Sequence, residues 1–186
     1  LCAPATWANF APGYSLALHD AHQPHQVHRA IHAVQVLLGE LELLQQDAER
    51  APFTVEFVEE PRVIDVGGVQ TRIVLDRVDR LADGTFAVID YKTGASARPA
   101  AWMGERPELP QLPLYVRAIG QEQVSAVAFG IVCKGGTEYR GFARDGAVFP
   151  QLKPFDAASA PFKDYANWGD LLQAWNRRLE SLALEH

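Results

Sequence analysis

Residues 67–94 read GGVQTRIVLDRVDRLADGTFAVIDYKTG, two apolar-rich segments joined by Ala82-Asp83-Gly84. A three-residue loop with glycine in its last, left-handed position is a favoured connection between antiparallel strands. With this loop Leu81 pairs with Thr85 and, counting back along both segments, Asp76 pairs with Asp90. A two-residue loop would slip the register by one residue and turn Asp76 away from Asp90. The stretch therefore predicts a β-hairpin, and with the three-residue loop both acids share one face.

The predicted face also carries a cation, because Lys92 lies two residues beyond Asp90 and side chains alternate along a strand. Like charges directly opposite each other destabilise a sheet, so two facing carboxylates require a compensating cation. A hard divalent ion held by carboxylate oxygens and several waters would supply that charge. A buried Asp–Lys ion pair at the end of the sheet is the alternative interpretation. The residues predicted around the charged groups are apolar: Val74, Val78, Phe86 and Val88.

Three segments carry a family resemblance: LDRVDRL at 75–81, IDYKTG at 89–94 and QLPLY at 111–115. In this combination they resemble the RecB-type nuclease domain of the PD-(D/E)xK, or restriction-endonuclease-like, superfamily, over about residues 25–145. The resemblance implies an α/β restriction-endonuclease-like core, with a central mixed β-sheet flanked by helices. It also implies a Mg²⁺- or Mn²⁺-dependent deoxyribonuclease that belongs to a larger bacterial DNA repair or recombination protein. The implied partners are DNA, other domains of the full-length protein and a helicase subunit.

The resemblance also assigns roles to residues of the predicted hairpin. Asp76 and Asp90 would hold the metal ion, together with the backbone carbonyl of Tyr91. Lys92 would contact the attacking water or the phosphate, as a base or as an electrostatic stabiliser. Asp79, by contrast, faces the other way from Asp76, which indicates a salt bridge with the neighbouring arginines 77 and 80 rather than catalysis.

Two further segments resemble motifs of the same family. Gln111 and Tyr115 share one helix face because they lie at i and i+4, and the resemblance implies that they line the substrate groove; ordinary polar packing is the alternative. VHRAIH at 27–32 resembles the first motif, in which a helix histidine, here His28, approaches the metal. We interpret His19, His22 and His25 as a solvated polar stripe, with a histidine-rich metal site as the alternative, and His32 has no assigned role.

Some features of the chain differ from the family pattern and motivate a second hypothesis. Ile73 stands where relatives usually have glycine, and the glycine that usually precedes the histidine motif in the helix is absent. Lys and Arg number 17 against 23 Asp and Glu, so the net charge is −6, which is poor for a DNA-binding protein. These features favour, as the alternative, a non-catalytic nuclease-like scaffold that binds DNA or a partner subunit.

The composition is that of one globular domain spanning residues 1–186, with 48% hydrophobic and 22% charged residues. We expect residues 1–21 to be a loose lead-in and residues 184–186 to be the remnant of a purification tag. No apolar run reaches the roughly 20 residues that a membrane span needs. Two cysteines, Cys2 and Cys133, suit a reducing bacterial cytoplasm. They are too few for the four-cysteine iron–sulfur cluster of some relatives.

The hydrophobic periodicity predicts a mixed order of helices and strands. A helix at 24–50 precedes strands at 53–60 and 63–66, which Pro61 separates, and then the hairpin. A long loop at 95–110, either functional or partly ordered, leads to a helix that Pro110 opens and Gly120 ends. The apolar run at 124–133 indicates an interior strand covered on both faces. An outer strand at 137–143, a loop at 150–161 and a final packing helix at 165–184 complete the chain.

Overall fold

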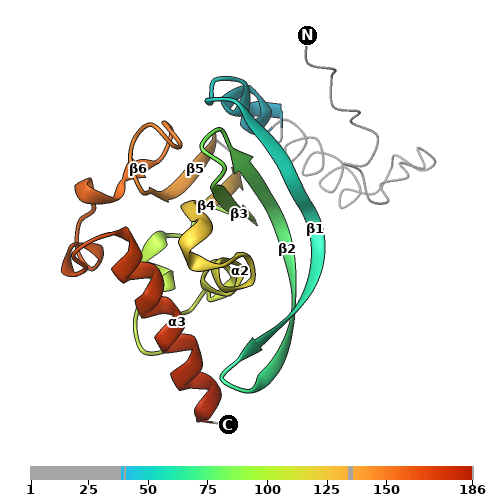
Figure 1. Ribbon diagram of the computed structural model, residues 1–186. Helices are drawn as coiled ribbons and strands as arrows, with labels where there is room; N and C mark the ends of the chain where they lie inside the picture. Colours follow the sequence, from blue (N-terminus) through green and yellow to red (C-terminus); the bar gives the residue numbers. More distant parts are fainter. Residues whose placement is uncertain (1–38, 40, 134–135, 186) are drawn as a thin grey trace, which may run out of the picture. The chain divides into compact units, whose positions relative to one another are not determined.

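The described part of the chain forms one six-stranded sheet with helices on both faces (Figure 1). This computed structural model describes residues 39, 41–133 and 136–185, which belong to one compact unit, Gln35–His186. The strands follow sequence order across the sheet: β1 (Phe53–Val66), β2 (Val69–Leu81), β3 (Phe86–Thr93), β4 (Val124–Cys133), β5 (Gly136–Ala143) and β6 (Lys153–Pro154). The pairs β3–β4 and β5–β6 are parallel, and the other pairs are antiparallel.

The longer helices are a segment at residues 41–48, α2 (Gln111–Ile119) and α3 (Trp168–Leu184). Four short 3-10 helices lie between the larger elements: η1 (Pro99–Trp102), η2 (Gln121–Gln123), η3 (Phe155–Ala157) and η4 (Phe162–Asp164). Within the described residues, no helix is long and apolar enough to cross a membrane. The predicted start of the first helix, the lead-in at 1–21 and all five histidines at 19–32 lie outside the described residues.

The hairpin loop has the predicted three residues, Ala82 to Gly84. The N–H of Leu81 donates to the carbonyl of Thr85 over 2.8 Å, and Gly84 has a φ of 84°, which a residue with a side chain rarely adopts. Both the N–H and the hydroxyl of Thr85 donate to the Asp83 carboxylate, which stabilises the turn. The register that follows, from Arg80 opposite Phe86 to Arg77 opposite Ile89, is the predicted one.

Side chains of β3 and β4 alternate between two cores. Val88 and Phe129 belong to the core that α2 and α3 cover. Ile89 and Ala128 belong to the opposite core, which Leu43 of the first helical segment helps to cover. β4 is buried from residue 124 to residue 132, which confirms the prediction of an interior strand. Figure 1 shows β1 and β2 as a long curved pair with α2 inside the curve.

The structure corrects the prediction that Pro61 divides two strands, because β1 runs without a break from Phe53 to Val66. Among the described residues β1 lies at the edge of the sheet, and proline is tolerated in an edge strand. The register of β1 shifts between Val55 and Phe57. Val74 is 44% exposed, because its neighbours Ile73 and Leu75 point into the core, so Val74 is not part of the apolar surroundings predicted for the charged groups.

The loops and the last helix differ from the prediction in detail. The loop at 95–110 is partly ordered, because η1 places Trp102 in the core with no exposed surface. The predicted loop at 150–161 contains β6 and η3. α3 begins at Trp168 rather than at residue 165, because the side chain of Asn167 accepts a hydrogen bond from the N–H of Asp170 and caps the helix.

Candidate active site

The candidate site lies on the face of the hairpin that packs toward α2. The paired register of the hairpin ends at Arg77 opposite Ile89, one residue short of Asp76. The Asp76 carboxylate still reaches β3, where it accepts a hydrogen bond from the N–H of Tyr91, the residue after Asp90. Asp90 is 1% exposed, whereas Asp76 is only partly buried. The two acids therefore lie near each other at the end of the paired part of the hairpin.

Lys92 supplies the cation on this face. Its Nζ donates a hydrogen bond to Oδ1 of Asp90 over 2.9 Å. The same Nζ lies 2.7 Å from Oδ2, but at an angle that makes no hydrogen bond. Oδ2 of Asp90 is thus buried beside a positive charge with no hydrogen-bond donor of its own among the described residues. A carboxylate oxygen in this state retains lone pairs for a further ligand.

Burial raises the pKa of Asp90 to about 6, because the charged carboxylate loses its hydration. The hydrogen bond from Lys92 opposes this rise, and the neighbouring Asp76 carboxyl adds to it. Two acids and one ammonium leave an excess of negative charge in a half-buried place. A divalent cation at the two carboxylates would remove this excess.

Asp76 is held by donors from two different elements. The backbone N–H of Tyr91 donates to its Oδ2 over 3.0 Å, and the hydroxyl of Tyr115 donates to its Oδ1 over 3.1 Å. Burial, then the negative charges of Asp76 and Asp90, raise the pKa of the Tyr115 hydroxyl, which keeps its proton. Helix α2 therefore fixes the orientation of an acid on β2.

Gln111 lies one helical turn before Tyr115 on the same side of α2. Its Oε1 is buried and has no hydrogen-bond partner in the described part of the chain. No hydrogen bond joins Gln111 to either acid there. Of the two predicted groove residues, the structure thus brings Tyr115 to the acids and leaves Gln111 one turn away. His28, the predicted histidine of the first motif, lies outside the described residues.

The predicted salt bridges of Asp79 are half correct. Arg77 binds Asp79, with Nε 2.7 Å from Oδ1, but the second partner is Arg50 rather than Arg80. Arg80 instead binds Glu56 on the neighbouring strand at the surface. Arg50 comes from the end of the first helical segment. No local pattern reveals that pairing, because 29 residues separate Arg50 from Asp79.

Two hollows of the described surface lie away from the acids. One, of about 450 Å³, is lined by Trp102, Trp175 and Arg178, and the other, of about 420 Å³, by Asp65, Arg117 and Asn176 among others. Neither lining includes Asp76, Asp90 or Lys92. The candidate site is therefore identified by its charged side chains and not by a deep cavity.

The sequence profile of the PD-(D/E)XK nuclease superfamily matches residues 3–183. The chain therefore belongs to this superfamily, and its mixed sheet flanked by helices is the restriction-endonuclease-like α/β fold. None of the curated proteins matches the chain. The solved structure of SSO0001 is similar at 18% identity, with a TM-score of 0.37, over 87% of this chain and 66% of that one. This chain spans just under two thirds of that protein.

Nucleases of this superfamily usually use divalent metal ions such as Mg²⁺. Within the described residues, no group of three His, Cys, Asp or Glu side chains comes close enough to hold a metal ion. Two neighbouring carboxylates, one of them paired with Lys92, still fit a hard cation that keeps several waters and takes few protein ligands. The acids at 76 and 90 and the carbonyl of Tyr91 are all oxygen donors, so the donor set suits Mg²⁺ or Mn²⁺.

Proposed function

We propose that the chain is a Mg²⁺- or Mn²⁺-dependent deoxyribonuclease that hydrolyses phosphodiester bonds. The observation that carries this proposal is the grouping of Asp76, which accepts from the N–H of Tyr91, with Asp90 and the ammonium of Lys92. Oδ2 of Asp90 lies 2.7 Å from the Lys92 ammonium, so a divalent cation would bind this oxygen in competition with Lys92. Membership of a nuclease superfamily supports the same chemistry.

In this proposal each residue of the cluster has a separate task. Asp76, Asp90 and the Tyr91 carbonyl hold the divalent ion, and His28 is a further ligand. When bound, such an ion polarises a phosphoryl oxygen and lowers the pKa of its coordinated water. The side chain of Lys92 is 25% exposed, so its remaining N–H groups can reach a phosphate oxygen or the attacking water while Asp90 holds it.

The residues of α2 act on the substrate side of the site. Tyr115 keeps one oxygen of Asp76 in a fixed orientation through its hydroxyl. Gln111 lines the substrate groove one turn earlier, a role that the resemblance of QLPLY to the family's helix motif implies.

We further propose that the domain is of the RecB type and belongs to a larger bacterial repair or recombination protein. The motifs LDRVDRL, IDYKTG and QLPLY support this subfamily, and so does the contact between Tyr115 and Asp76, which joins the first and third of them. Its partners are DNA, other domains of that protein and a helicase subunit in the cytoplasm.

A second candidate function is a non-catalytic scaffold that binds DNA or a partner subunit. The net charge of −6 favours it, because a DNA-binding surface must then come from local charge alone. Arg77, in the middle of the motif LDRVDRL, is 4% exposed and engaged by two acids, so it adds no positive charge to a binding surface.

Cleavage of linear single- and double-stranded DNA, with and without Mn²⁺, separates the two functions. We expect the wild-type chain to cleave only with the metal, and the Asp90→Asn variant to lose cleavage while keeping its circular dichroism spectrum. Asp156→Asn, at an exposed acid of η3, is the matched control and should cleave like the wild type. Cleavage by Asp90→Asn at the wild-type rate would contradict the nuclease assignment. Mn²⁺ binding that is lost in Asp90→Asn, measured by calorimetry, would exclude a scaffold with a degenerate site.

A further inference from the structure

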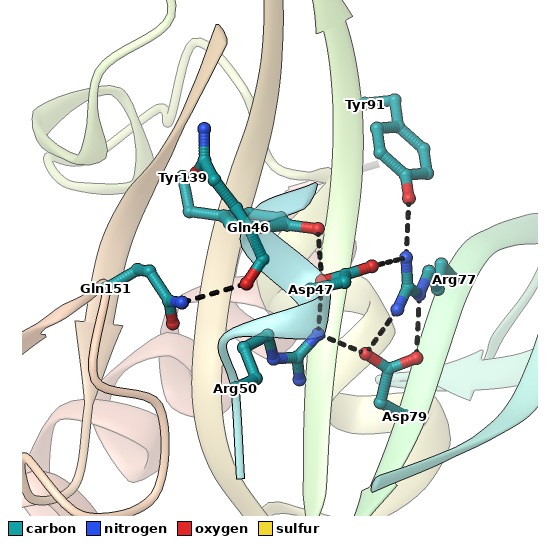
Figure 2. Close-up of polar contacts among 8 residues, drawn as sticks. All are labelled: Gln46, Asp47, Arg50, Arg77, Asp79, Tyr91, Tyr139 and Gln151. Atoms are coloured by element: carbon teal, nitrogen blue, oxygen red, sulfur yellow. Dashed lines mark hydrogen bonds and ion pairs between the residues drawn. The ribbon is translucent and has the colours of Figure 1, made fainter. Parts of the chain in front are cut away.

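A buried cluster of charged residues lies on the face of the sheet opposite the candidate site (Figure 2). It joins the first helical segment to strands β2, β3 and β5. Two arginines and two aspartates balance each other, and two tyrosines complete the cluster: Asp47, Arg50, Arg77, Asp79, Tyr91 and Tyr139. The four charged residues are all at most 8% exposed.

Arg77 is the centre of the cluster. Its Nε and Nη2 donate to both oxygens of Asp79, over 2.7 and 2.9 Å. Its Nη1 donates to Oδ2 of Asp47 over 2.7 Å and to the hydroxyl of Tyr91 over 3.1 Å. The guanidinium is therefore fixed in one orientation by three residues from three different elements.

A buried ion cluster is not the simplest way to stabilise a sheet, because desolvation of the charges cancels much of their attraction. Apolar side chains of similar volume often serve equally well. In some proteins such a cluster instead fixes the relative position of the elements that contribute to it.

The cluster meets the candidate site at Arg77 and Tyr91. Arg77 directly follows Asp76, and Tyr91 lies between Asp90 and Lys92. The backbone N–H of Tyr91 donates to Asp76 on one face of the sheet. On the other face, its hydroxyl accepts a hydrogen bond from Arg77. Strand β3 is thus tied to neighbouring residues of β2 on both faces, at the position where the two acids meet.

The ring of Tyr91 is also fixed by its neighbour on β4. Tyr91 pairs with Gly130, and a Cβ added at Gly130 would lie 2.6 Å from Cδ1 and 2.8 Å from Cε1 of the ring. The ring therefore occupies the space that any other residue at position 130 would fill. This close packing restricts the position of the ring, and therefore the position of the hydroxyl that Arg77 contacts.

We propose that Arg77 and the side chain of Tyr91 are positioning residues, which act from the opposite face of the sheet to hold Asp76 and Asp90 at the separation that a divalent ion requires. This inference rests on the proposed function of the two acids as metal ligands. The Tyr91 side chain contacts neither the ion nor the substrate. Its effect passes through the backbone of β3 and through Arg77.

Two tyrosine variants test the proposal without breaking the ion cluster. Tyr91→Phe removes the hydroxyl that Arg77 contacts and keeps the ring and the backbone carbonyl. Tyr139→Phe is the matched control, because its hydroxyl donates to Asp47 in the same cluster but comes from β5, two strands from β3. Substituting Arg77 itself is less informative, since two buried aspartates would lose their partner.

Calorimetry with Mn²⁺ and single-turnover cleavage give the first readout. We expect Tyr91→Phe to weaken Mn²⁺ binding and slow cleavage by about 10-fold or more, the range found when a residue behind a metal ligand is changed. Tyr139→Phe should keep the Mn²⁺ affinity and the cleavage rate close to those of the wild type. Each variant loses one hydrogen bond, so both should lose a similar free energy of unfolding in urea. Equal effects of the two variants on Mn²⁺ affinity would overturn the proposal.

Hydrogen exchange of the residue 91 amide gives a second readout that needs no metal. This amide donates to Asp76, so we expect its exchange to accelerate about 10-fold in Tyr91→Phe, which is the effect of losing one hydrogen bond. In Tyr139→Phe the exchange rate of the same amide should be unchanged. Equal exchange rates in the two variants would overturn the proposal. A wild-type chain that binds no Mn²⁺ contradicts the proposed function instead, and the amide exchange then decides the positioning role by itself.

Discussion

The hydroxyl of Tyr115 donates a 3.1 Å hydrogen bond to Oδ1 of Asp76, which joins helix α2 to the acid on strand β2. Tyr115→Phe removes this contact and keeps the buried ring. We expect stability to fall by about 1 kcal/mol, since one hydrogen bond is lost. Cleavage should fall by about 10-fold, because Asp76 loses the donor that orients it. Tyr165→Phe, at a partly buried tyrosine ahead of α3, is the control. Unchanged cleavage in Tyr115→Phe would show that α2 does not contribute to the site through this hydrogen bond.

Lys92 should affect the chemical step without being needed for the metal. Lys92→Met removes the ammonium that lies 2.7 Å from Oδ2 of Asp90. We expect cleavage to fall by about 10²- to 10³-fold, as when a donor to a developing negative charge is removed. Mn²⁺ affinity should stay the same or increase, because the carboxylates lose a competing cation. Lys163→Met, at an exposed lysine of η4, is the control. Parallel loss of Mn²⁺ binding in Lys92→Met would show that Lys92 serves only to build the site.

Gly130 should tolerate no side chain, because the ring of Tyr91 occupies the space beside it. In Gly130→Ala the added Cβ would lie 2.6 Å from the ring. We expect a loss of stability of about 1–3 kcal/mol in urea denaturation, the range for overpacking in a core. Gly146→Ala is the control, because a Cβ added at this glycine would meet no described atom within 4 Å. Equal stability of the two variants would contradict the packing of Tyr91 against β4.

The buried ion cluster and the surface ion pair should differ in their effect on stability. Asp79→Ala leaves Arg50 and Arg77 without a shared acid in the core, and we expect a loss of about 3–5 kcal/mol. Glu56→Gln breaks the surface pair with Arg80, which water screens, so we expect stability close to the wild type. Urea denaturation at low and high salt measures both. A large effect of Glu56→Gln, or a small one of Asp79→Ala, would contradict this assignment of burial.

The hairpin could be predicted from sequence because its determinants are local. Gly84 in the left-handed position fixes a three-residue loop, and the loop fixes the register of both strands. That register brings Asp76 to the end of the paired region, and hydrogen bonds from the N–H of Tyr91 and from Tyr115 on α2 then hold its carboxylate. The interior position of β4 is equally local, since its residues form one unbroken apolar run. In both cases neighbouring residues in the sequence carry the whole signal.

The features that could not be predicted depend on contacts between distant segments. Pro61 interrupts a strand only where both sides of the strand have partners, and the sequence does not show that β1 lies at the edge. Arg50 reaches Asp79 across 29 residues, and Arg77 reaches Asp47 across 30. The pattern of charges within LDRVDRL favours the nearest partners and therefore predicts, wrongly, that Arg80 binds Asp79. Tertiary packing decides these pairings, and the sequence around each residue does not indicate its partner.

Anomalous scattering from crystals of the chain grown with Mn²⁺ tests the central claim most directly. We predict one strong anomalous peak between the carboxylates of Asp76 and Asp90, with Tyr91 contributing its carbonyl oxygen, and no such peak in crystals of Asp90→Asn. A Mn²⁺ ion that binds only elsewhere on the chain, or no peak at saturating Mn²⁺, would contradict the account.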